Sequence, residues 1–99
     1  MSYRINLRPE AETEISETAG WYTRRGIGLG TDFLDEVANT LSVLGENPDR
    51  FPIVEGDIRK TLLRRFPYVI LFSIRGDAVV VISCFHTRRD PTHWRDRLR

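Results

Sequence analysis

The chain has 99 residues, of which 40% are hydrophobic and 29% are charged, and its formal net charge is +1. This length suits one compact domain with a single modest core, so we expect one domain over residues 1–99. No apolar run approaches the ~20 residues that a membrane span requires, and the N-terminus lacks the apolar core of a signal peptide. We therefore expect a cytoplasmic protein that makes no membrane contact.

The small net charge conceals an uneven distribution. Residues 1–58 carry five Arg against eleven acidic residues, whereas residues 59–99 carry nine Arg and Lys60 against three Asp. Such a concentration of cations predicts a polyanion or an acidic protein segment as partner, because phosphate or carboxylate groups would offset the repulsion among the Arg side chains. The alternative is a fold in which two oppositely charged layers neutralise each other.

The first half of the chain predicts a strand followed by a helix. Residues 3–7 alternate and end at Arg8-Pro9, which indicates a short strand. Pro9 suits the first position of a helix, and acidic residues fill its first turns, where the helix dipole favours negative charge. Apolar residues then recur at three- and four-residue spacing: Ala11, Ile15, Ala19 and Tyr22. We expect this helix to run to about Arg25 and to stop at Gly26.

A second helix follows the glycine-rich segment 26–30. This segment joins two helices and lacks the Gly-Lys-Ser/Thr sequence of a phosphate-binding loop, so we interpret it as a flexible connection. Thr31 or Asp32 can cap the second helix, which Gly45 and Pro48 end. Its apolar stripe consists of Phe33, Val37, Leu41 and Leu44. Residues 47–56 read as a loop whose Phe51 and Ile53 are expected to lie beneath the sheet.

The second half predicts three antiparallel strands, over residues 58–65, 66–74 and 78–85. The last two are apolar on both sides, which is typical of strands buried on two faces. Gly76-Asp77 supplies the positive φ that a hairpin turn needs. Strand 58–65 carries four cations, so part of it should face solvent or a partner. Cys84 is expected to be a small buried hydrophobe.

Several short motifs, taken in order, resemble the RelE/ParE superfamily of toxins from bacterial type II toxin–antitoxin systems. They are Trp21-Tyr22, Gly30-x-Asp32-Phe33, Pro48-x-x-Phe51-Pro52, Ile58-Arg59-Lys60 with Leu62, Arg65-Phe66-Pro67-Tyr68, Phe72, and His86-x-Arg88-Arg89-Asp90-Pro91-x-x-Trp94. The resemblance covers nearly the whole chain and favours the ParE-like subgroup. It implies an α+β fold, with an N-terminal strand and a helical hairpin packed on an antiparallel sheet of three to four strands.

The resemblance also implies partners and a target. Such toxins bind a cognate antitoxin tightly in a hetero-oligomer, and their systems are associated with plasmid stabilisation and growth inhibition. ParE-like members inhibit DNA gyrase and need not be enzymes, whereas RelE-like members cleave mRNA in the ribosomal A site. That cleavage needs cations around the phosphate and groups that move protons. A degenerate, non-toxic antitoxin-binding module is a further alternative.

The candidate site residues follow from these two activities. RelE-type nucleases, which this chain resembles, commonly carry Tyr-Arg at the start of the central strand, a basic residue after the last strand, and a Tyr or His near the C-terminus. The matching positions in this chain are Tyr68-Val69, Arg88-Arg89 and Trp94. Valine cannot bind phosphate and indole is no acid or base at neutral pH, which favours the ParE-like hypothesis. The residues left for a ribonuclease are His86, Arg88, Arg89, Arg59 and Arg65, with His93 in reserve.

His86 could carry a proton in such a site, or it could be a strand-end imidazole hydrogen-bonded to backbone. The residues expected to bind antitoxin or target are Arg59, Arg65, Arg88, Arg89, Trp94, Phe33, Val37 and Leu41. Two histidines seven residues apart and a buried Cys make no metal ligand set, and we expect neither metal nor cofactor.

Overall fold

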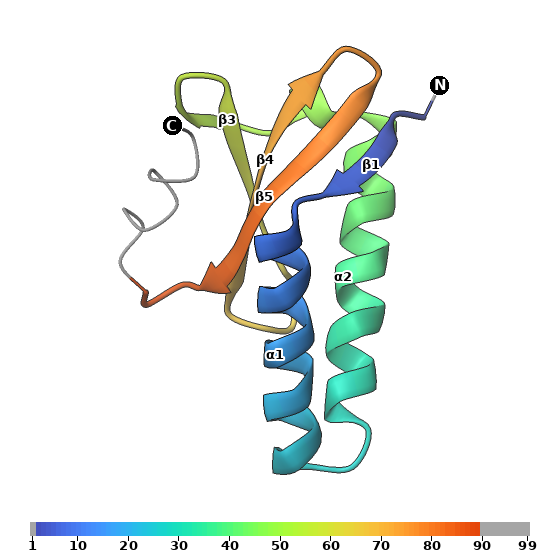
Figure 1. Ribbon diagram of the computed structural model, residues 1–99, viewed down its shortest axis with the longest axis vertical. Coiled ribbons are helices and arrows are strands. Elements are labelled where there is room, and N and C mark those ends of the chain that lie inside the picture. Colours follow the sequence, from blue (N-terminus) through green and yellow to red (C-terminus); the bar gives the residue numbers. More distant parts are fainter. Residues whose placement is uncertain (1, 90–99) are drawn as a thin grey trace.

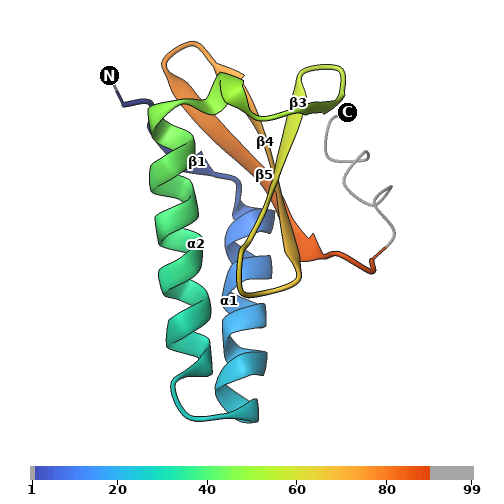
Figure 2. The ribbon, with the colours of Figure 1, turned by 180° about the vertical axis from the view of Figure 1, so that it is seen from behind.

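A computed structural model describes residues 2–89, which form two helices packed against one face of a five-stranded sheet (Figure 1, Figure 2). The elements are β1 Arg4–Leu7, α1 Pro9–Arg25, α2 Leu29–Glu46, the 3-10 turn η1 Pro48–Arg50, β2 Ile53–Glu55, β3 Ile58–Leu62, β4 Tyr68–Arg75 and β5 Ala78–His86. His93 and Trp94 lie outside the described residues. The α+β class and the helical hairpin are confirmed.

The helices form where their apolar spacing predicts them. Pro9 stands in the first turn of α1 with Glu10 and Glu12, Arg24 and Arg25 occupy the last turn, and the buried face is Ala11, Ile15 and Ala19. Charges of these signs stabilise the two helix ends through the dipole. Helix α2 begins earlier than the predicted Thr31 or Asp32 cap, because Gly28 adopts the left-handed φ of 78° and serves as the N-cap.

The sheet is mixed and has five strands, slightly more than the three to four predicted. The strand order is β1-β5-β4-β3-β2. Strand β1 pairs in parallel with β5, with Arg4 opposite Ala78 and Leu7 opposite Val81, while the other pairs are antiparallel. The parallel pairing is possible because the whole α1–α2–β2–β3–β4 stretch lies between the two strands in sequence.

The connection after α2 also differs from the loop predicted there. It contains η1 and the short edge strand β2, which pairs Ile53 with Arg59. Phe51 packs edge-on against Phe72 at 5.9 Å as expected, but Ile53 is 54% exposed and does not lie beneath the sheet. Strand β3 ends at Leu62 and β4 begins at Tyr68, so residues 63–67 form a loop where the sequence predicts strand.

The core lies between the hairpin and the sheet. Its largest fully buried side chains include Phe33 and Leu44 from α2 and Phe72 and Ile70 from β4, and Tyr22 packs against them at the edge. A second apolar cluster occupies the opposite face of the sheet, with Ile58, Val69, Leu71, Ile82 and Phe85. Strand β4 therefore buries side chains on both faces, as its sequence predicts.

The turn between β4 and β5 and the environment of Cys84 also agree with the prediction. Gly76 has a φ of 59°, and Cys84 is 1% exposed. The tip of the α1–α2 hairpin extends past the end of the sheet (Figure 1). No helix within residues 2–89 is long and apolar enough to cross a membrane.

Candidate partner-binding groove and basic strand end

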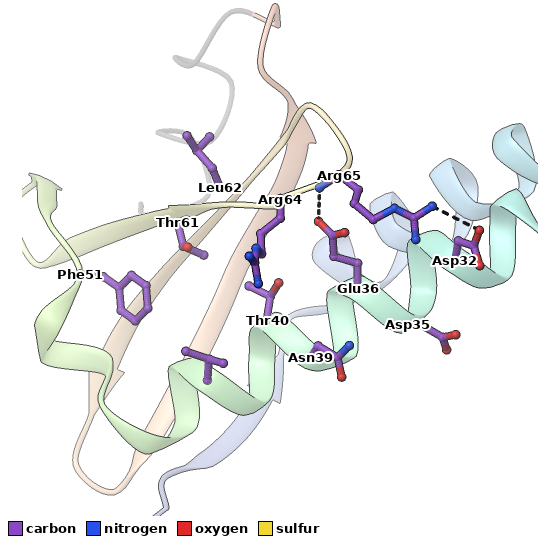
Figure 3. A pocket seen from close by; sticks show the side chains of 11 residues that line it. Asp32, Asp35, Glu36, Asn39, Thr40, Phe51, Thr61, Leu62, Arg64 and Arg65 are labelled. Atoms are coloured by element: carbon purple, nitrogen blue, oxygen red, sulfur yellow. Dashed lines mark hydrogen bonds and ion pairs between the residues drawn. The ribbon is translucent and has the colours of Figure 1, made fainter.

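A groove of about 590 Å³ runs between α2 and the β3 side of the sheet (Figure 3). Its α2 wall is one helical face, because Asp32, Glu36, Asn39 and Val43 recur at four-, three- and four-residue spacing. The other wall consists of Phe51, Thr61, Leu62, Arg64 and Arg65. Val43 and Leu62 are 59% and 57% exposed, so the groove presents apolar surface to solvent.

The acidic end of α2 holds the β3–β4 loop in place. The Arg65 backbone N–H donates to Glu36 Oε2 at 2.8 Å, and the Arg65 guanidinium lies 3.5 Å from Asp32 Oδ2 (Figure 3). Both contacts are exposed, so the ion pair itself contributes little to stability. These contacts join the acidic N-terminal half of the chain to its basic C-terminal half. The neighbouring Arg64 is exposed and lines the groove.

Arg59 performs a structural task inside the fold. Its Nη1 donates to the backbone carbonyls of Asp49 at 3.0 Å and Phe51 at 2.6 Å, so its side chain clamps the chain between α2 and β2. Lys60, on the next position of β3, is exposed. The prediction that part of this strand faces solvent therefore holds for Lys60. Arg59 is half-buried, and its guanidinium donates hydrogen bonds to carbonyl oxygens.

The second candidate region is the end of β5. The Arg88 backbone N–H donates to His86 Nδ1 at 3.0 Å, and the His86 ring stands edge-on to Tyr68 at 5.2 Å. Because Nδ1 accepts this bond, the proton of the neutral imidazole lies on Nε2. Arg88 and Arg89 are exposed. A shallow hollow of about 360 Å³ lies beside His86 and is lined by Glu17, Trp21, Tyr22 and Tyr68.

The five ribonuclease candidates do not converge on one point. Arg59 lies opposite Phe72 and His86 lies opposite Tyr68, so they differ by four residues along β4 and lie on opposite sides of it. This places their backbones about 13 Å apart along the strand and roughly 10 Å apart across it. Arg65 is held against α2. His86, Arg88 and Arg89 lie together at the end of β5, where the Thr87 N–H donates to the Pro67 carbonyl of the β3–β4 loop at 2.8 Å.

Two of the residues predicted to contact a partner are inside the core. Phe33 is 0% exposed and Val37 is 4% exposed, so neither presents surface for direct contact. Leu41 is partly buried against the same core. The apolar stripe of α2 faces the sheet, and the apolar side chains that α2 exposes are Leu34 and Val43. Within residues 2–89, no cluster of three or more His, Cys, Asp or Glu side chains has the arrangement of a metal site.

Comparison with known protein families decides the classification. The sequence model of the family described as ParE toxin of type II toxin–antitoxin system, parDE, matches residues 5–91, which is most of the chain. The chain belongs to the ParE toxin family. Membership makes it the toxin type of a toxin–antitoxin pair, in agreement with the resemblance seen in its motifs.

Solved structures share the fold of this ParE family member. The chromosomal ParDE toxin–antitoxin system from P. aeruginosa has a TM-score of 0.73 at 13% identity, covering 86% of this chain and 96% of that one. A mutant of E. coli toxin RelE in the free state has a TM-score of 0.61 at 18% identity, covering 89% and 86%. The RelBE2 toxin–antitoxin complex from Mycobacterium tuberculosis gives 0.58 at 16%, covering 87% and 99%.

These identities are too low to transfer more than the fold. A comparison with curated protein sequences gives no significant match.

The sequence analysis does not predict the α2–β3 groove, although the sequence contains a signal for it. Val43 is an apolar residue off the buried stripe of the helix, and such residues mark exposed apolar surface.

Proposed function

We propose that this ParE family toxin arrests bacterial growth by inhibiting DNA gyrase and that a cognate antitoxin neutralises it. The family match carries the toxin assignment, because it spans residues 5–91. The gyrase target rests on the ParE-like character of the sequence and on the distribution of its polar groups. Both the toxin and its target would then be in the cytoplasm.

The positions of the candidate catalytic groups favour inhibition by binding over RNA cleavage. Cleavage by attack of a 2′-hydroxyl needs cations and a proton carrier gathered within a few ångströms of one phosphate. Arg59 is committed to carbonyl groups of Asp49 and Phe51. Val69 occupies the position where the resemblance implies an arginine, and its side chain is buried in the second apolar cluster. A target-binding role requires no such assembly.

The antitoxin is the first partner of this proposal. The solved relatives include a ParDE system and RelBE complexes, so their toxin chains share this fold in structures that contain an antitoxin. A tight hetero-oligomer would explain exposed apolar side chains on this chain, such as Val43 and Leu62. An acidic antitoxin segment would also complement the basic half of the sequence.

Two activity assays separate the target hypotheses. Purified toxin is expected to block supercoiling by DNA gyrase and to leave ribosome-bound mRNA intact in a translation reaction at the same concentration. Cuts in A-site mRNA with gyrase unaffected would establish the RelE-like ribonuclease alternative instead.

Expression in a bacterium tests the toxin assignment independently. Inducing this chain alone should arrest growth, and co-expressing the antitoxin encoded beside it should restore growth. Unchanged growth at verified soluble expression would contradict toxicity and would leave the antitoxin-binding module as the remaining function.

A further inference from the structure

The free end of the α1–α2 hairpin projects past the end of the sheet and carries exposed apolar and basic side chains (Figure 1, Figure 2). Ile27 is fully exposed in the connection between the helices, and Trp21, near the end of α1, is 44% exposed. Arg24 and Arg25 occupy the last turn of α1 and are also exposed. We call Trp21, Arg24, Arg25 and Ile27 the hairpin-end surface. None of these residues lines the α2–β3 groove, so the two surfaces are separate.

Trp21 is held in place by its neighbours on α1. The Arg25 guanidinium carbon lies 4.4 Å from the centroid of the Trp21 ring, and the same ring stands edge-on to Tyr22 at 5.0 Å. Tyr22 packs in turn against Phe33 at 5.6 Å and Phe66 at 4.8 Å, so the base of Trp21 rests on the core. An exposed Trp on such a base loses little side-chain entropy when a partner binds.

The two helices are also fixed to each other at this end. Gly30 approaches α1 so closely that an added Cβ would lie 2.6 Å from Ala19 O. The Leu29 N–H donates to Gly26 O at 3.3 Å, and Gly28 between them adopts a positive φ, which closes the connection tightly. The hairpin end therefore presents its side chains as a preformed unit.

The cations of the hairpin-end surface have no acidic partner among the described residues. The ion pairs formed within residues 2–89 use Arg4, Arg65 and Arg75 and leave out Arg24 and Arg25. Acidic side chains of a partner would relieve the repulsion between these two neighbouring guanidinium groups. Trp and Arg are also the residue types that most often dominate the binding energy of a protein interface.

The hollow of about 360 Å³ described above opens beside Trp21 and gives this surface a pocket. It is lined by Glu17, Thr18, Trp21, Tyr22, Tyr68 and His86. Its aromatic rings suit an apolar side chain of a partner. The Glu17 carboxylate would repel a phosphate group, so the lining favours a protein segment over nucleic acid.

We infer that the hairpin-end surface is the contact through which this toxin binds DNA gyrase, and that the gyrase segment in contact carries an apolar side chain flanked by acidic ones. The apolar side chain occupies the hollow beside Trp21, and the acidic groups face Arg24 and Arg25. Trp21 and the two arginines carry the contact, whereas His86 only lines the hollow. The inference rests on the proposed gyrase target and names the toxin surface that serves it.

A matched pair of alanine substitutions tests the aromatic contact. Trp21 and Leu34 are equally exposed, at 44% and 45%, but Leu34 lies in a separate hollow with Leu7 and Ile15. The concentration of purified toxin that half-inhibits gyrase supercoiling should rise by at least about tenfold in Trp21→Ala and by less than about threefold in Leu34→Ala. Thermal unfolding of both variants verifies folding. Equal inhibition by the two folded variants would overturn the inference.

A second pair of variants tests the charges and leaves the core untouched. Arg24→Gln combined with Arg25→Gln should also raise the half-inhibiting concentration by at least about tenfold. Arg50→Gln combined with Lys60→Gln is the control, because it removes the same charge from exposed residues that form no ion pair within residues 2–89. This control should change inhibition by less than about threefold. Equal losses in both double variants would attribute the effect to net charge and overturn the site.

Binding measurements separate the inference from the function on which it rests. Wild-type toxin should bind purified gyrase in surface plasmon resonance and should leave duplex DNA alone unshifted in a gel. Binding of duplex DNA alone that is lost in Trp21→Ala would assign the surface to nucleic acid and overturn the protein partner. If wild-type toxin blocks supercoiling and the variants block it equally well, only the surface is wrong. If wild-type toxin leaves supercoiling unaffected, the gyrase target is wrong and the inference with it.

Discussion

At the scale of single residues, Glu14 is the side chain that ties α1 to β5. Its Oε1 accepts from Ser83 Oγ at 3.0 Å and from the Cys84 backbone N–H at 2.9 Å. Strand β1 pairs with β5 only as far as Val81, so within residues 2–89 no strand lies beside that edge of β5 beyond this point. The carboxylate therefore takes the place of a missing strand for one backbone amide.

Removing this carboxylate should destabilise the protein. Glu14→Ala leaves the Cys84 amide without its acceptor, which costs on the order of 1–3 kcal/mol in the free energy of unfolding. Glu14→Gln retains an amide oxygen and should lose less. Urea unfolding measures the difference, with Glu17→Ala at an exposed position of the same helix as control. Equal losses for the alanine and glutamine variants would show that the acceptor is unimportant.

The thiol of Cys84 predicts how stability changes in alkali. Burial, and secondarily the Glu14 carboxylate, raises the pKa of this thiol to about 12 from an ordinary value of 9.0. Above pH 9 the unfolded chain loses a proton that the folded chain keeps, so this contribution to stability is complete below pH 9 and declines as pH rises toward 12. Unfolding free energy should fall more steeply between pH 9 and 10 in wild type than in Cys84→Ala. Parallel slopes would exclude the thiol as a cause.

At the scale of elements, the two helices approach closely at one glycine. A Cβ added to Gly30 would collide with the Thr23 hydroxyl and would lie 2.6 Å from Ala19 O, so α1 and α2 pass each other through this gap. A Cβ added to Gly20 would meet only the tip of Arg24, at 3.5 Å. The same substitution therefore has opposite consequences on the two helices.

Gly30→Ala should destabilise the protein by about 1–3 kcal/mol, because the contact is with backbone and the helices must separate. Gly20→Ala should be neutral or stabilise by up to about 1 kcal/mol, since alanine is the better helix former. Thermal and urea unfolding of the two variants compare them directly. A loss at Gly20 as large as at Gly30 would mean that close helix packing is not the cause.

The elements also show what a single sequence can specify. The periodicity of α1 and of β4–β5 predicted these segments closely, because a buried face repeats along each of them. Strand β2 was missed because its three residues are all exposed and carry no alternation. The parallel pairing of β1 with β5 depends on tertiary contact between distant segments, and no local signal encodes it.

The candidate site was harder to predict than the fold for the same reason. Arg59 looked available for phosphate, but the carbonyls that engage it belong to residues eight and ten positions earlier in the chain. The apolar spacing of α2 predicts partner contacts at Phe33 and Val37, but the sheet covers this face of the helix. Sequence identifies a charged or apolar face, and only the packing determines which neighbour uses it.

At the scale of the whole molecule, the polar groups suited to catalysis are divided among separate elements. His86 stands at the end of β5 and accepts a hydrogen bond from the Arg88 amide, Arg65 is held by α2, and Arg59 clamps the connection before β2. A toxin that acts by binding tolerates this division, whereas a nuclease must concentrate its cations and its proton carrier at one phosphate.

His86→Gln therefore separates the two modes of action. Glutamine keeps an oxygen that can accept the Arg88 N–H bond, so the turn after β5 should remain intact while the titratable group is lost. For a gyrase inhibitor, growth arrest and inhibition of supercoiling should stay within about threefold of wild type. For a nuclease that uses this imidazole, loss of the proton carrier should lower RNA cleavage roughly 10²–10⁴-fold, and toxicity should fall with it. The variant's unfolding temperature, measured beside that of wild type, ensures that a loss of toxicity is not a loss of folding.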